Sequence, residues 1–185
     1  MPEASDEFIL SLFEKPKTKE QAFELLVKKY QRVVYYNARR IVSLHEDAND
    51  VAQNVFIKIW KNLDRFRGDS SLKTWITKIS INESLTFIEK KKKLLNLTDD
   101  NYANFLVVSQ PETNFISSNE IQQLLQEEIL KLPPKQRAVF TMRYYDETPY
   151  AEMSKIFDTS ESALKASYHF AAEKIKKNIS ERLTF

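Results

Sequence analysis

The residues with the clearest chemical potential lie in one segment, where cationic and aromatic side chains alternate. Residues 65–68 have the sequence RFRG and include the only glycine of the chain, and Lys73, Trp75 and Lys78 follow shortly after. Cationic groups bind phosphates and aromatic rings stack on unpaired bases, so this mixture is typical of proteins that bind single-stranded nucleic acid. The residues alone leave a second interpretation open, in which the segment is a surface turn whose aromatic rings belong to the core.

Other kinds of chemistry find little support in the sequence. The chain has no cysteine and two histidines, His45 and His169, which stand far apart in the sequence. This excludes disulfides and thiolate metal sites. No group of residues suggests a nucleophile with a base, so we expect a protein that is not an enzyme and that needs no cofactor or metal. The sequence has neither a long apolar run nor a signal peptide, which predicts no membrane insertion and a cytoplasmic location.

Charge is unevenly distributed along the 185 residues, although the net charge is only +2. Residues 64–93 carry a net charge of +4 and residues 131–185 a net charge of +3, whereas residues 94–130 have six acidic side chains and no basic one. Two basic blocks are therefore joined by an acidic segment. This pattern suggests a polyanionic partner for the blocks and a different surface for the segment between them.

Apolar periodicity predicts that both basic blocks are helical. A content of 42% hydrophobic and 29% charged residues with almost no glycine favours helices. In the N-terminal part, which ends with the first basic block, we expect a bundle of about four helices, over residues 4–14, 20–42, 46–63 and 71–93. In the C-terminal part, from residue 119 onward, we expect four more helices. They cover residues 119–132 and 135–145, then run from the N-cap Thr148 and first helical residue Pro149 to residue 157, and from residue 160 onward.

Two parts of this pattern carry more specific expectations. Residues 94–118 show no sustained period, which predicts an extended linker lying along a partner surface; a strand is the alternative. The last two helices are joined by a short turn in which Asp158 suits a left-handed conformation. That arrangement is typical of a helix-turn-helix, whose second helix enters the major groove of DNA. A generic three-helix bundle fits the same pattern equally well.

Residues 47–82 and 132–171, separated by a basic run and a linker, together resemble an extracytoplasmic-function (ECF) sigma factor of the bacterial sigma-70 family. The resemblance runs from about residue 19 to residue 177. It implies an all-α fold with two small helical domains, a sigma-2-like bundle and a sigma-4-like helix-turn-helix domain, joined by an acidic linker. The expected boundaries are residues 1–94, 95–118 and 119–185.

The resemblance also implies roles for individual residues. Contacts with core RNA polymerase are expected from Asp50, Gln53, Asn54, Phe56, Ile57 and Trp60. The −10 element of the promoter is expected to meet Arg65, Phe66, Arg67, Gly68, Asp69, Ser70, Lys73, Thr74, Trp75, Lys78 and Asn82. The −35 element is expected to meet Ser162, Lys165, Ala166, His169, Phe170 and Lys174.

The function that the resemblance implies is promoter recognition and DNA melting at the start of transcription. The expected partners are core RNA polymerase, through its β and β′ subunits, promoter DNA and an anti-sigma factor. The alternative from another class is a stand-alone helix-turn-helix regulator whose N-terminal bundle senses a ligand or dimerises. That regulator would bind palindromic operators without polymerase.

Overall fold

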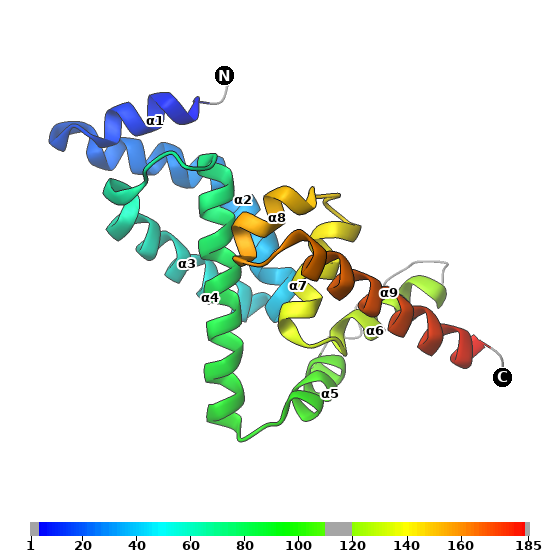
Figure 1. Ribbon diagram of the computed structural model, residues 1–185. Helices are drawn as coiled ribbons and strands as arrows, with labels where there is room; N and C mark the ends of the chain where they lie inside the picture. The colour runs from blue at the N-terminus through cyan, green and yellow to red at the C-terminus, as the bar shows by residue number, and fades with distance from the viewer. Residues whose placement is uncertain (1–3, 110–119, 184–185) are drawn as a thin grey trace.

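The computed structural model describes residues 4–109 and 120–183, and within these ranges it contains helices and no strand (Figure 1). This confirms the all-α class. The α-helices are α1 (Asp6–Phe13), α2 (Lys19–Val42), α3 (His45–Asn62), α4 (Leu72–Leu95), α5 (Asp99–Ser109), α6 (Glu120–Leu130), α7 (Pro134–Tyr144), α8 (Tyr150–Phe157) and α9 (Glu161–Leu183). Two short 3₁₀ helices, η1 (Pro16–Thr18) and η2 (Leu63–Arg65), precede α2 and the loop before α4.

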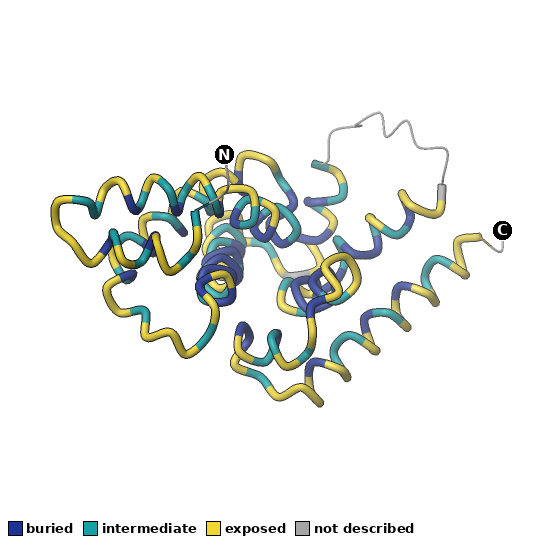
Figure 2. The backbone as a smooth tube through the Cα atoms, turned by 90° about the horizontal axis from the view of Figure 1, so that it is seen from above, coloured by how far each residue is buried: buried dark blue, intermediate teal, exposed yellow. Residues whose placement is uncertain are grey.

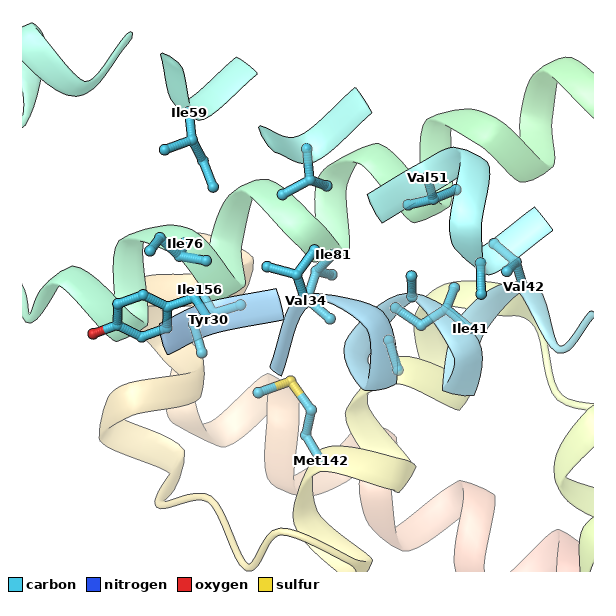
Figure 3. Packing of buried hydrophobic residues seen from close by; sticks show 14 of the residues in the cluster. Tyr30, Val34, Ile41, Val42, Val51, Ile59, Ile76, Ile81, Met142 and Ile156 are labelled. Atoms are coloured by element: carbon cyan, nitrogen blue, oxygen red, sulfur yellow. The ribbon is translucent and has the colours of Figure 1, made fainter. Parts of the chain in front are cut away.

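Helices α1 to α4 form the N-terminal bundle. Their apolar stripes meet in one core, in which Val34, Ile59 and Ile81 are at most 1% exposed (Figure 3). Burying an aliphatic side chain of this size contributes about 1.5–3 kcal/mol relative to leaving it in water. The 3.6-residue period of the sequence therefore specifies which face of each helix turns inward.

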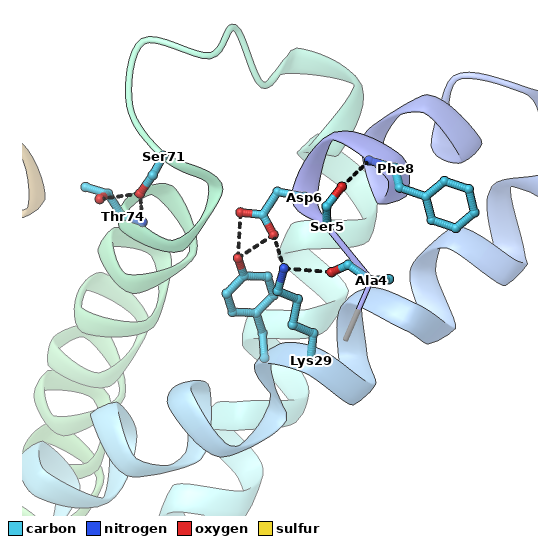
Figure 4. A network of polar contacts seen from close by, with 8 residues as sticks. Ala4, Ser5, Asp6, Phe8, Lys29, Ser71 and Thr74 are labelled. Carbon is cyan, nitrogen blue, oxygen red and sulfur yellow. Dashed lines mark hydrogen bonds and ion pairs between the residues drawn. The ribbon is translucent and has the colours of Figure 1, made fainter. Parts of the chain in front are cut away.

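Local hydrogen bonds fix where these helices begin and end (Figure 4). The Ser5 hydroxyl accepts from the amide of Phe8 at 3.2 Å, and the Ser71 hydroxyl accepts from the amide of Thr74 at 3.1 Å. Serine side chains at this position satisfy amides that the first helical turn leaves free. Helices α2 and α4 end at residues in the left-handed conformation, Ser43 and Asn96.

The C-terminal part consists of α6 to α9. A small core holds α6, α7 and α9 together, and the ring of Phe140 stacks on Tyr168 with centroids 5.4 Å apart. The turn between α8 and α9 contains Asp158 at φ 49°, as the sequence predicts. The Ser160 hydroxyl accepts from the amide of Ala163 at 3.3 Å and caps α9.

Helices α7 and α8 also pack against the N-terminal bundle. Met142 of α7 and Ile156 of α8 point into the same apolar cluster as Tyr30, Val34 and Ile76 (Figure 3). One buried core thus runs through both parts of the chain, while the C-terminal half of α9 extends away from it (Figures 1 and 2).

The expectation of an extended linker was wrong for residues 99–109, which form helix α5. Tyr102 and Leu106 are buried at 1% and 0% exposure, and the ring of Phe105 stacks on that of Tyr102. The spacing of these three residues is helical, and the Thr98 hydroxyl accepts from the amide of Asn101 at 3.3 Å. The buried apolar face thus overrides the turn-forming Asn and Asp residues of the segment. The rest of the expected linker, residues 110–118, lies outside the described residues.

The expected cap of α8 was displaced by one residue. Pro149, with extended backbone dihedral angles, occupies the N-cap position, and the helix begins at Tyr150. The Thr148 amide donates instead to the Met142 carbonyl at 3.1 Å, and the Thr148 side chain is buried. Thr148 therefore belongs to the closing turn of α7 rather than to the start of α8.

Candidate nucleic-acid interface

The loop between η2 and α4 presents cations around a single left-handed residue. Gly68 has φ +78°, and a Cβ atom added to it would have no neighbouring atom within 4 Å, so the backbone conformation rather than space requires glycine here. Arg65, Arg67 and Asp69 are exposed around it. The loop is therefore shaped by its backbone and leaves its charged groups available to a ligand.

The aromatic residues of this segment are partly buried and partly exposed. The rings of Phe66 and Trp75 lie 5.5 Å apart, and both side chains are half-buried against the main core. Both rings pack against the core and keep part of their surface in solvent. A half-buried ring can still stack on a base, because only one of its faces is needed.

The remaining candidate residues for −10 DNA lie on α4 in different environments. Lys73 and Asn82 are exposed, whereas Thr74 is 6% exposed. The Thr74 hydroxyl donates to Glu152 Oε1 of α8 at 3.0 Å. The Lys78 ammonium group contacts Asp158 Oδ1, in the turn after α8, at 2.7 Å. Thr74 and Lys78 are thus already bound by the C-terminal part of the same chain, an arrangement that the sequence did not reveal.

The candidate polymerase contacts on α3 divide into two groups. One group is exposed along the outer side of the helix, and it comprises Asp50, Gln53, Asn54 and Ile57. Phe56 and Trp60 instead belong to an aromatic cluster with α1 and α2, in which the rings of Phe23 and Trp60 are 4.9 Å apart. The second group therefore positions α3 within the bundle and offers only a partial surface to a partner.

The predicted recognition helix α9 presents its candidate residues to solvent. The exposed residues are Ser162, Lys165, Ala166, His169, Phe170 and Lys174. Leu164, Ala171 and Ile175 face the core at the expected spacing. Phe170 is 65% exposed although it is strongly apolar, so its ring is available to a ligand on this face. The Lys165 ammonium group lies 5.6 Å from the ring centroid of Tyr150, on α8.

Arg137 is a structurally central residue that sequence reasoning missed. Its side chain, on α7, is 1% exposed and donates to the Ile41 carbonyl at 2.8 Å and the Ser43 hydroxyl at 3.2 Å. It also donates to the carbonyls of Leu130 at 2.5 Å and Leu132 at 3.2 Å. One guanidinium group therefore satisfies carbonyls at the carboxyl ends of α2 and α6, where backbone carbonyls lack helical partners.

Burial lowers the pKa of Arg137 to about 10, against a smaller opposing influence of Tyr102, so the guanidinium group is charged at neutral pH. The negative ends of two helix dipoles favour a cation at this place. The sequence carries no sign of this burial, because Arg137 follows Lys135 and Gln136 directly before the apolar stripe that begins at Ala138. An arginine at the edge of an apolar helical stripe more often keeps its charged group in solvent.

The structure excludes some other sites within its described range. Among residues 4–109 and 120–183, no group of three or more histidine, aspartate or glutamate residues could hold a metal ion. In the same residues, no helix is both long enough and apolar enough to cross a bilayer.

Two protein-family models match this chain. The model of sigma-70 region 2 matches residues 26–94, which include the α3 and α4 candidates. The model of sigma-70 region 4 matches residues 122–175, which include the turn between α8 and α9 and the exposed part of α9. The two regions together cover most of the described chain, in the order that the resemblance implied.

Individual proteins extend the comparison over most of the chain. The ECF RNA polymerase sigma-E factor of Escherichia coli K12 is 30% identical over 169 residues, which cover 86% of this chain and 87% of that protein. The ECF RNA polymerase sigma factor SigW of Bacillus subtilis is 27% identical over 168 residues, covering 86% and 90%.

Two solved structures have the same fold. The sigma factor RpoE of Bartonella quintana, solved with the anti-sigma factor NepR, has a TM-score of 0.62 at 18% identity, covering 84% of this chain and 94% of that one. CnrH, solved with the cytosolic domain of CnrY, has a TM-score of 0.59 at 19% identity, covering 88% and 90%. With regions 2 and 4 both present and a 30% identical relative covered almost throughout, this chain belongs to the ECF sigma factors of the sigma-70 family and is an RNA polymerase sigma factor.

Proposed function

We propose that this sigma factor binds core RNA polymerase through α3, opens the −10 element with the loop before α4 and with α4 itself, and reads the −35 element with α9. The observation that carries the proposal is the match to regions 2 and 4 in sequence order, each containing an exposed surface with cationic side chains. The assignment of individual residues is a prediction that rests on the position of each side chain.

At the −10 element the chain has to hold a base outside the duplex. Taking a base out of the stack costs a few kcal/mol, which stacking and a shaped pocket offset. Phe66 and Trp75 supply aromatic faces, and Gly68 gives the loop a backbone shape that other residues adopt only with strain. Arg65, Arg67, Asp69, Ser70, Lys73 and Asn82 surround these rings with charged and polar groups. A single strand bound here prevents the duplex from closing again.

At the −35 element the DNA remains double-stranded. One side of the first turns of α9 is exposed, and in a helix-turn-helix this part of the second helix faces base edges in the major groove. Ser162, Lys165 and His169 can form hydrogen bonds with base edges or phosphates, and Ala166 and Phe170 can contact thymine methyl groups. Lys174, further along the helix, is suited to a phosphate contact that positions α9.

Polymerase binding is assigned to the outer side of α3. Asp50, Gln53 and Asn54 form a polar strip beside Ile57, which is 51% exposed. Such a strip suits a helical partner, since polar groups set the register and the apolar side chain is buried on contact. The resemblance implies that this partner is the clamp-helix coiled coil of the β′ subunit.

The two DNA surfaces work together once they are held on the polymerase. With domains at residues 1–94 and 119–185 and a linker between them, binding at one element raises the effective concentration of the other surface at its own element. The factor then acts in the cytoplasm as a specificity subunit and performs no covalent chemistry itself. Because RpoE was solved with the anti-sigma factor NepR, we propose that a protein inhibitor of that kind also binds this chain.

A run-off transcription assay tests the proposal. Core polymerase is mixed with the purified chain on a library of promoter templates, and transcripts are compared with those made by core alone. The proposal predicts new, template-specific transcripts that depend on the chain. If core alone gives the same transcripts, and the chain instead binds a palindromic site without polymerase, the stand-alone regulator is the correct interpretation.

A further inference from the structure

The outer side of α2 carries a concentration of positive charge that the proposed function does not use. Between residues 25 and 44 the chain has five lysine or arginine residues and no aspartate or glutamate. Lys28, Arg32 and Arg39 are separated by about one and about two helical turns, so they lie on one side of the helix. Val34, on the opposite side, is fully buried in the core.

These three cations have no partner in the part of the chain that the structure describes. Two neighbouring cations of α2 are paired, since Lys29 contacts Asp6 at 2.7 Å and Arg40 pairs with Asp146. The side chains of the other three form no ion pair or hydrogen bond with any described residue. Like charges one turn apart destabilise a helix. The fold therefore gains nothing from this arrangement, which points to a ligand of opposite charge.

An exposed aromatic ring lies among the unpaired cations. Tyr36, one turn after Arg32, is 49% exposed. Its ring meets that of Tyr35 at 72° with centroids 5.4 Å apart, and the Tyr35 hydroxyl forms a hydrogen bond with His45 Nδ1 at 2.8 Å. Cations that flank an exposed ring suit a single-stranded nucleic acid, which offers phosphates and unpaired bases. We call the four residues the α2 stripe: Lys28, Arg32, Tyr36 and Arg39.

The α2 stripe follows the loop that we assign to the −10 element. Lys19, the first residue of α2, contacts Asp64 of η2 at 2.8 Å, which places the start of the loop beside the start of the helix. At 1.5 Å per residue, Lys28 lies about 14 Å further along α2 and Arg39 about 30 Å further. A strand held by the loop can therefore continue along the helix.

We propose that the α2 stripe binds the non-template strand of the opened promoter beyond the −10 element, toward the transcription start. The inference rests on the proposed function, because it takes the position of the −10 strand from the loop before α4. Lys28, Arg32 and Arg39 contact phosphates, which carry no sequence information. Tyr36 stacks on an unpaired base, which every sequence offers. The α2 stripe thus keeps the promoter open without selecting it.

Forked promoter DNA separates these contacts from those at the −10 element. The shorter probe is duplex up to the −10 element and ends with the single-stranded non-template −10 segment. The longer probe extends that strand toward the start by about ten nucleotides, a length within the range of single-strand binding sites. Binding by the complex of the chain with core polymerase is measured by fluorescence anisotropy, and the result is the gain in affinity that the extension gives.

Two variants of the α2 stripe should reduce this gain. Each phosphate contact with a single strand adds about 0.7 to the salt slope, which is about fivefold in affinity at 0.1 M salt. Lys28→Gln/Arg32→Gln/Arg39→Gln should therefore reduce the gain by about fivefold to 100-fold and lower its salt slope by up to about 2. Tyr36→Ala should reduce the gain at least about fivefold, whereas Tyr36→Phe, which keeps the ring, should retain it.

The control removes three exposed cations from the C-terminal part. Lys155→Gln/Lys176→Gln/Lys177→Gln alters the net charge equally, and we expect it to change the affinity for both probes by the same factor. An unchanged gain in the triple variant of the α2 stripe, or an equal loss in both triple variants, would overturn the proposal.

Two further outcomes separate this inference from its alternatives. Weaker binding of the triple variant of the α2 stripe to core polymerase without DNA would overturn the inference, because the stripe would then be a protein contact. A complex of the unmodified chain that does not bind even the shorter probe would overturn the proposed function, and this inference with it.

Discussion

Replacing Arg137 by methionine removes one buried cation together with its hydrogen bonds to four acceptors. The four are the carbonyls of Ile41, Leu130 and Leu132 and the hydroxyl of Ser43. Hydrogen bonds from a charged group contribute about 1.5–3 kcal/mol each. The cost of burying the guanidinium group offsets much of their sum, so we expect a net loss of about 3–5 kcal/mol in the free energy of unfolding.

Urea denaturation followed by tryptophan fluorescence and circular dichroism measures this loss. For a chain of this size it corresponds to a fall in melting temperature of about 6–20 °C. Arg137→Lys keeps the charge but not the planar arrangement of donors, and we expect it to recover less than half of the loss. Arg32→Met, at an exposed position on α2, is the control, with an expected change within about 0.5 kcal/mol.

The reasoning would be refuted if Arg137→Met were as stable as Arg32→Met. The pH dependence gives a second check with a defined sign. Burial lowers the folded-state pKa of Arg137 to about 10, well below its ordinary value in the unfolded chain. Between these values the unfolded chain binds more protons, so this group alone makes stability rise with pH above about 10. Arg137→Met removes that contribution.

Three further predictions concern the surfaces and the acid stability of the C-terminal part. Asp50→Ala with Gln53→Ala should weaken core binding in a pull-down while leaving the circular dichroism spectrum unchanged; unchanged binding would move the polymerase contact elsewhere. Replacing a thymine of the −35 element by deoxyuridine should weaken binding by the complete polymerase about fourfold at one position, since one methyl group contributes about 0.8 kcal/mol. Phe170→Ala should abolish the difference in affinity between the two DNAs. A difference that persists in this variant would exclude a contact between the ring and the methyl group. Burial raises the pKa of Glu128, but hydrogen bonds and charges from Lys131 and its neighbours outweigh burial and lower the pKa below 4.5. The stability advantage of the wild type over Glu128→Gln should therefore be present above pH 4.5 and lost as pH falls through the folded-state pKa. A stability difference that stays constant in urea titrations at pH 7 and pH 3 would contradict this.

Apolar periodicity and caps made most of the helices predictable. The stripe containing Val34 and the serine caps Ser5 and Ser71 are local signals, and the structure has helices where they indicate. Helix α5 escaped this reasoning because its Asn and Asp residues favour turns, and its apolar face is stabilised only by packing on the rest of the chain. The helical spacing of Tyr102 and Leu106 was present in the sequence but was outweighed.

The contacts between the two parts of the chain were beyond sequence reasoning for a different reason. An exposed-looking Lys78 on α4 and Asp158 in a distant turn carry no sign in the sequence that they pair, because nothing local depends on the pair. Arg137 likewise has its acceptors on α2 and around the end of α6. Periodicity assigns a residue to a face of its helix, but it does not identify which other helix covers that face.

Permanganate reactivity of promoter thymines tests the central claim most directly, because it detects unpaired bases at the −10 element. Promoter DNA is treated with core polymerase alone, with the chain alone and with both together. The account predicts reactive thymines at the −10 element only when both are present, and a loss of that reactivity in Lys73→Ala/Asn82→Ala. If the chain and core together leave every thymine unreactive on a promoter that they transcribe, this chain does not melt the −10 element and the account is contradicted.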